Sequence, residues 1–146
     1  MEKFIKSLVK IFSSLQDVSL LFVRLILAYG FYGPAMKKLS NFAGVVQWFS
    51  EGLHLPFPYI NAAMAVATEV SGVILLTLGL MTRLISIPMM VVMTVAISTV
   101  HWVNGFSASN NGYEIPLYYL IMLFLLLTTG PGKISLDEII LKKISK

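Results

Sequence analysis

The residues of this chain best suited to chemistry are ionisable side chains that interrupt apolar stretches: Arg24, Glu69, His101 and Glu114. Lipid offers no hydrogen-bond partners, so an ionisable group in a membrane-spanning helix costs several kcal/mol unless it is paired or hydrated. A carboxylate or an imidazole held there can bind a polar ligand or relay a proton. We therefore treat these positions as ligand-binding candidates, and the sequence assigns no catalytic residue.

Glu69 is the most informative of these positions. It lies near the centre of a long apolar run, on a helical face that it shares with Ala62, Ala65 and Gly72. Small residues let helices approach closely, so this face is expected to point into a helix bundle. Arg24 is the only cation expected at comparable depth, and we predict that it pairs with Glu69. The pair either takes part in function or only fixes helix register, because buried ion pairs often cost as much as they return.

A second group of candidates is expected near one membrane surface. Glu114 begins an apolar segment, with Tyr118 one turn deeper. His101 ends a line of side chains at helical spacing, which comprises Ser86, Met90, Thr94 and Ser98. Lys37, His101 and Glu114 would form a shallow polar mouth above the deeper ion pair, with Tyr118 beside it. The alternative for His101 is that it only anchors a helix end at the interface.

Neither a metal ion nor an intrinsic redox centre is indicated. The chain has no cysteine, which excludes disulfides, thiolate metal sites, iron–sulfur clusters and a CxxC relay. No HxxxH or HxxE spacing is present, and methionines in an apolar helix usually serve packing. No cofactor is evident, so a redox role would require a bound cofactor or quinone.

The composition places these residues in a lipid bilayer. The chain has 146 residues, enough for one domain, and is 57% hydrophobic and 12% charged, whereas soluble domains are about a quarter charged. Its net charge of +4 comes from lysines gathered near both ends, a distribution typical of the positive-inside rule. No basic patch interleaved with aromatic residues indicates nucleic-acid binding.

We therefore predict an all-α membrane protein, a four-transmembrane-helix bundle that forms a single domain over residues 1–146. The spans are expected at about 18–33, 59–80, 84–103 and 115–129. Gly33-Pro34 is expected to end the first span, because proline lacks a backbone donor and restricts the residue before it. The side that holds most lysines and arginines is assigned to the cytoplasm, which places both termini there.

Short amphipathic helices at the membrane interface are expected to flank the spans. One precedes the first span over residues 3–15, with lysines on one face and apolar residues on the other. A second is expected over residues 42–53, between spans 1 and 2. A third follows the last span at the C-terminus, where Ser135 and Glu138 have the spacing of a capping box.

The order of these residues resembles that of the DoxX family of bacterial membrane proteins. The resemblance runs from about residue 17 to residue 137. It rests on Arg24-x5-Gly30-x2-Gly33-x3-Lys37, Glu69-x2-Gly72, Leu78-Gly79-x3-Arg83, His101, Gly105-Phe106, Gly112-Tyr113-Glu114 and Gly130-Pro131-Gly132-x2-Ser135-Leu136-Asp137. It implies a four-helix bundle in the bacterial inner membrane. The family takes its name from a subunit of a thiosulfate:quinone oxidoreductase, so it also implies a redox-associated role. The positions that match its recurrent polar residues are Arg24, Lys37, Glu69, His101 and Glu114.

Three functions follow from these observations. The leading hypothesis is a membrane subunit that binds a quinone or a similar small polar-headed molecule in a polar pocket and serves a redox complex. His101 or Tyr118 would hydrogen-bond a carbonyl, while Glu69 or Glu114 would relay a proton. The alternatives are a membrane scaffold for a partner oxidoreductase or biosynthetic enzyme, and a small solute or ion transporter that would need a homodimer.

Overall fold

The fold is a set of apolar helices, seen in a computed structural model that describes the backbone of residues 2–144 and the side chains of residues 12, 13 and 15–144. Within that range there are six α-helices and no strand. The helices are α1 (Glu2–Ser40), α2 (Phe42–Gln47), α3 (Pro58–Leu78), α4 (Thr82–Ala96), α5 (Glu114–Thr129) and α6 (Leu136–Ile144). Two π-helical turns, Trp48–Gly52 and Ile97–His101, extend α2 and α4.

Among the residues that the structure describes, three helical segments are long and apolar enough to cross a membrane: Leu15–Ser40, Pro58–Leu78 and Thr82–Asn104. Helix α5 is also apolar but has only 16 residues. The prediction of an all-α membrane protein is therefore confirmed, and helices cover the four segments predicted as spans. The bounds of α3, α5 and the α4 segment are close to those expected, whereas α1 is much longer than the predicted span 18–33.

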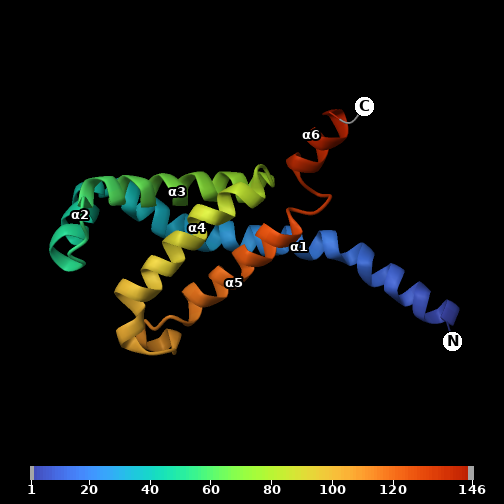
Figure 1. Ribbon diagram of the computed structural model, residues 1–146, viewed down its shortest axis with the longest axis horizontal. Coiled ribbons are helices and arrows are strands. Elements are labelled where there is room, and N and C mark those ends of the chain that lie inside the picture. The colour runs from blue at the N-terminus through green and yellow to red at the C-terminus, as the bar shows by residue number, and fades with distance from the viewer. Residues whose placement is uncertain (1, 145–146) are drawn as a thin grey trace.

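The helices pack as two pairs that cross at an angle (Figure 1). Helix α1 lies along α3, α4 lies along α5, and α3 turns tightly into α4. The described core forms where these pairs meet and includes Leu27, Phe31, Leu76, Met89 and Leu123, none of which is more than 2% exposed. Helix α2 and the α4–α5 connection lie at one end of the bundle, and α6 lies at the other (Figure 1).

The expected break at Gly33-Pro34 is wrong, because α1 continues through Pro34 to Ser40. Proline disfavours a helical residue before it partly by a clash with that residue's Cβ, and Gly33 has none. The missing hydrogen bond of Pro34 is also tolerable in a spanning helix, where local adjustment satisfies the freed carbonyl. The segment 3–15 is the start of the same helix and not a separate one, and the faces on which Lys3, Lys6 and Lys10 lie are outside the described side chains.

The C-terminal segment fastens the turn between α3 and α4. Gly79 ends α3 in the left-handed conformation, at φ 65°, which favours glycine. The carboxylate of Asp137 then accepts hydrogen bonds from the backbone N–H groups of Met81, at 2.7 Å, and Thr82, at 3.1 Å, and so caps the start of α4. The predicted cap at Ser135 is confirmed, since its Oγ accepts from the Glu138 N–H at 3.3 Å.

Candidate functional site

The carboxylate of Glu69 is sealed inside the bundle, as its small-residue face predicted, and is 1% exposed. Its partner is Lys38, from the last turns of α1, whose Nζ binds Oε1. The second carboxylate oxygen, Oε2, has no hydrogen-bond partner among the described residues. The ammonium side of this pair is less enclosed, because the Lys38 side chain is 27% exposed.

The predicted Arg24–Glu69 pair is wrong. Arg24 is fully buried, but its guanidinium donates from Nη1 to the Leu76 carbonyl, at 3.4 Å, and from Nη2 to the carbonyl of Ile134. Leu76 lies two turns beyond Glu69 on α3, about 10 Å along the helix axis. Arg24 therefore ties α1 to the end of α3 and to the C-terminal segment, away from the carboxylate.

The sequence interpretation missed Lys38 because it ended the first span at Gly33. If α1 is continued through Pro34, Lys38 falls on the buried face at the spacing of Arg24, Leu27, Phe31 and Ala35, all of which are buried. That periodicity was the signal available in the sequence. It also follows from the antiparallel packing of α1 and α3 that Lys38 meets the middle of α3 when Arg24 meets its end.

A groove of about 580 Å³ runs between α3 and α4 beside Lys38. Its walls are mostly apolar, and three wall residues, Met64, Ile87 and Val91, are each at least half exposed, so the groove is open along one side. Trp48 and Phe49, in the π-helical turn after α2, also line it, as does His101, at the end of the π-helical turn that extends α4. The groove is thus an apolar channel, open along one side, with a small number of polar groups in its lining.

The remaining candidates do not form a single mouth. His101 lines the groove, and its Nδ1 lies 2.8 Å from the Asn111 carbonyl oxygen. Glu114 instead fastens the α4–α5 connection, because Oε2 accepts from the Ala108 N–H at 2.9 Å and Oε1 accepts from the Tyr118 hydroxyl at 3.0 Å. Lys37 has an exposed side chain and is not among the residues that line the groove.

The hydroxyl groups of the predicted polar line along α4 use their donors within the helix. The hydroxyls of Ser86, Thr94 and Ser98 each donate to a carbonyl three or four residues earlier, at 2.8, 2.9 and 3.1 Å. Such bonds satisfy the hydroxyl within its own helix. The polar character of the groove therefore depends on Lys38 and His101 more than on these residues.

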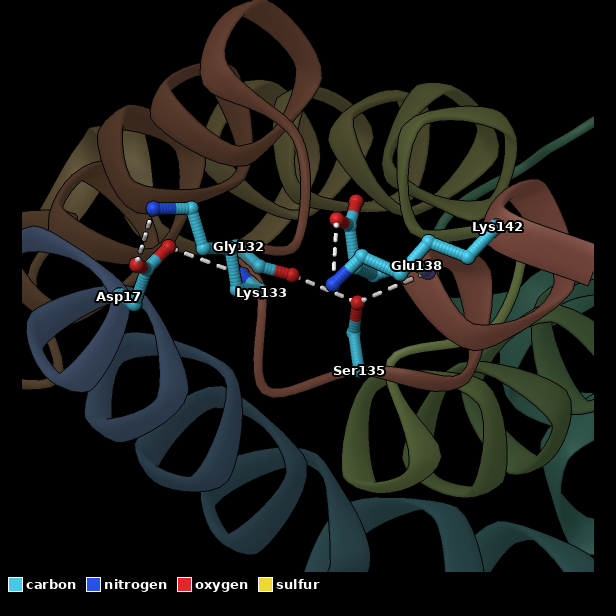
Figure 2. A network of polar contacts seen from close by, with 6 residues as sticks. All are labelled: Asp17, Gly132, Lys133, Ser135, Glu138 and Lys142. Carbon is cyan, nitrogen blue, oxygen red and sulfur yellow. Dashed lines mark hydrogen bonds and ion pairs between the residues drawn. The ribbon is translucent and has the colours of Figure 1, made fainter. Parts of the chain in front are cut away.

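A second cavity, of about 660 Å³, lies at the opposite end near α6. Asp17, Lys133 and Glu138, charged residues of its lining, already have partners (Figure 2). Asp17 accepts from the Lys133 N–H at 2.8 Å and pairs with its Nζ at 3.5 Å, while Glu138 pairs with Lys142 at 3.2 Å. We regard this network as structural and the groove as the better candidate for a ligand.

Apolar helices of spanning length, packed around a buried ion pair, define a multi-pass helical membrane protein. Comparison with known proteins agrees. The chain belongs to the DoxX family, whose sequence model matches residues 19–102, more than half of the chain. It is 34% identical over 132 residues to an uncharacterized protein of Haemophilus influenzae, covering 86% of this chain and 85% of that protein.

The chain is also 33% identical over 132 residues to the inner membrane protein YphA of Escherichia coli, covering 87% of this chain and 94% of that protein. No protein of known structure matches the chain. The family, the relative in the inner membrane and the apolar helices together support a multi-pass inner membrane protein.

Proposed function

We propose that this protein binds a quinone, or a similar molecule with a polar head and an apolar tail, in the groove between α3 and α4. The observation that carries the proposal is the groove itself: about 580 Å³ of mostly apolar space, open along one side, with Lys38 and His101 in its lining. Sites for small apolar ligands have this character, with apolar walls and a few placed polar groups that orient the head. The volume also falls within the range of such sites, about 300–1,000 Å³.

Each part of the ligand would have a partner in the groove. The Lys38 ammonium, which is paired with Glu69, or the His101 imidazole meets an oxygen of the head. The tail lies along Ile87 and Val91 and leaves between α3 and α4 into the lipid. In this proposal the protein is a membrane subunit that serves a redox complex, and its electrons come from a partner protein.

We further propose that α5 is a fourth span and that both termini are cytoplasmic. With 16 residues α5 is about 24 Å long, slightly short of the roughly 30 Å hydrocarbon core, and it packs along α4. Four spans return the chain to its starting side, and the lysine-rich ends favour the cytoplasm. Because the chain has no cysteine, single variants Ser109→Cys and Lys133→Cys test this. An impermeant maleimide should label only Ser109→Cys from outside, and the reverse pattern would refute the orientation.

The test of binding is a thermal-shift titration of the purified protein in nanodiscs with decylubiquinone. The melting temperature should rise saturably with quinone. Ala65→Phe, which places a ring in the groove, should abolish the shift, because Ala65 lines it. Ala67→Phe is the matched control, since Ala67 is on the same helix, exposed, and outside the groove. The proposal fails if saturating quinone produces no shift or if both variants respond as the wild type does.

A further inference from the structure

The hydrogen bond made by His101 fixes which of its ring nitrogens carries the proton. Nδ1 lies 2.8 Å from the backbone oxygen of Asn111, and a carbonyl oxygen can only accept. Nδ1 therefore donates, and in the neutral imidazole Nε2 is an acceptor. Among the described residues that line the groove there is no carboxylate.

The loop holds this arrangement in place. The Asn111 carbonyl also accepts from the Asn104 amide at 3.2 Å, and Asn111 has a left-handed backbone, at φ 58°. The Glu114 carboxylate fixes the same connection through the Ala108 N–H. The Nδ1 edge of the ring thus faces the loop, and Nε2 lies on the opposite edge. His101 lines the groove, and its Nε2 has no hydrogen-bond partner among the described residues.

Lys38, the other ionisable residue among the described lining of the groove, has the opposite character. The Lys38 ammonium has three donors and no acceptor, and Glu69 Oε1 takes one of them. Two other groove residues donate hydrogen bonds to backbone carbonyls. The Thr99 hydroxyl donates to the Val95 carbonyl at 2.7 Å, and the Asn61 side-chain amide donates to the Pro56 carbonyl at 2.6 Å. The described lining of the groove therefore includes donors at Lys38 and an acceptor without a partner at His101, with Thr68 and Trp48 as further polar residues.

Resting on the proposed function, we propose that the groove selects a head that carries a hydroxyl donor, such as a quinol or an alkyl phenol, over a head with acceptors alone, such as a quinone or an aryl ether. The hydroxyl donates to His101 Nε2, the acceptor that the loop leaves without a partner. A head without a donor leaves Nε2 desolvated and unpaired, which weakens binding about tenfold, the usual order for one lost hydrogen bond.

The experiment uses 4-decylphenol and its methyl ether, 4-decylanisole, which share a tail and undergo no redox change. Isothermal titration of the protein in nanodiscs should show that the phenol binds about tenfold more tightly than the ether. His101→Phe should bring the phenol down to the affinity of the ether and leave the ether unchanged. Trp102→Phe is the control at the next residue, which is exposed and outside the groove, and this variant should keep the difference.

A second measurement needs no change at His101. Nitrogen-15 spectra of histidine-labelled protein, assigned with His54→Asn, should show protonated Nδ1 and bare Nε2 at His101. The Nε2 signal should move on addition of the phenol but not of the ether. Equal affinity of phenol and ether, or a protonated Nε2 in the unliganded protein, overturns the inference while the proposed function stands. If neither compound binds and decylubiquinone also fails to bind, both are refuted.

Discussion

Removing the ammonium of Lys38 should destabilise the bundle far more than removing the charge of Glu69. In Lys38→Met the Glu69 carboxylate, 1% exposed, loses its counter-ion, and breaking a buried pair from one side costs about 3–5 kcal/mol. In Glu69→Gln the remaining Lys38 side chain is 27% exposed and its ammonium can turn toward the groove, so we expect a loss of about 1–2 kcal/mol. The double variant should lose less than the sum, with a coupling energy of about 1.5–3 kcal/mol.

The assay is reversible unfolding in mixed detergent micelles, followed by far-ultraviolet circular dichroism. A parallel cycle with Arg24→Gln and Glu69→Gln is the control, because Arg24 donates to the Leu76 and Ile134 carbonyls and not to the carboxylate. That cycle should be additive within about 0.5 kcal/mol. Additive behaviour of Lys38 with Glu69, or a coupling energy for Arg24 as large as that expected for Lys38, would refute the pairing.

Two further predictions concern the turn between α3 and α4, both measured by the same unfolding assay. Asp137→Ala should lower the free energy of unfolding by about 1–2 kcal/mol, because it removes the carboxylate that caps the start of α4. Glu138→Gln only weakens an exposed pair and should lower it by at most about 0.5 kcal/mol. Equal losses in the two variants would contradict the cap. Gly79→Asn should lower the free energy of unfolding by at least about 2 kcal/mol, because a Cβ at this position would overlap the Arg24 guanidinium. Backbone strain is not the reason, since asparagine tolerates the left-handed conformation. A variant of wild-type stability would show that this close approach is absent.

The helices could be predicted from sequence because lipid constrains them strongly. A spanning segment must be apolar and of a fixed length, so composition alone located α3, α4 and α5 closely. The burial of Glu69 and Arg24 could also be predicted, since charges in such segments must face the bundle.

The partner of Glu69 could not be predicted from the expected depth of each charge in the membrane alone. A single local rule, that proline ends a helix, shortened the first span at Gly33 and removed Lys38 from consideration. The groove was missed for a different reason. It depends on how α3 and α4 diverge after their turn, and that angle is set by packing against α1 and α5, which no periodicity within one helix encodes.

The most direct test of a ligand site between α3 and α4 is photoaffinity labelling with an azido-quinone, followed by peptide mapping. Adducts should fall on groove residues such as Thr68 and Val95, and excess decylubiquinone should suppress them. Adducts concentrated instead in the cavity near α6, or labelling of the groove that decylubiquinone does not reduce, would contradict the account.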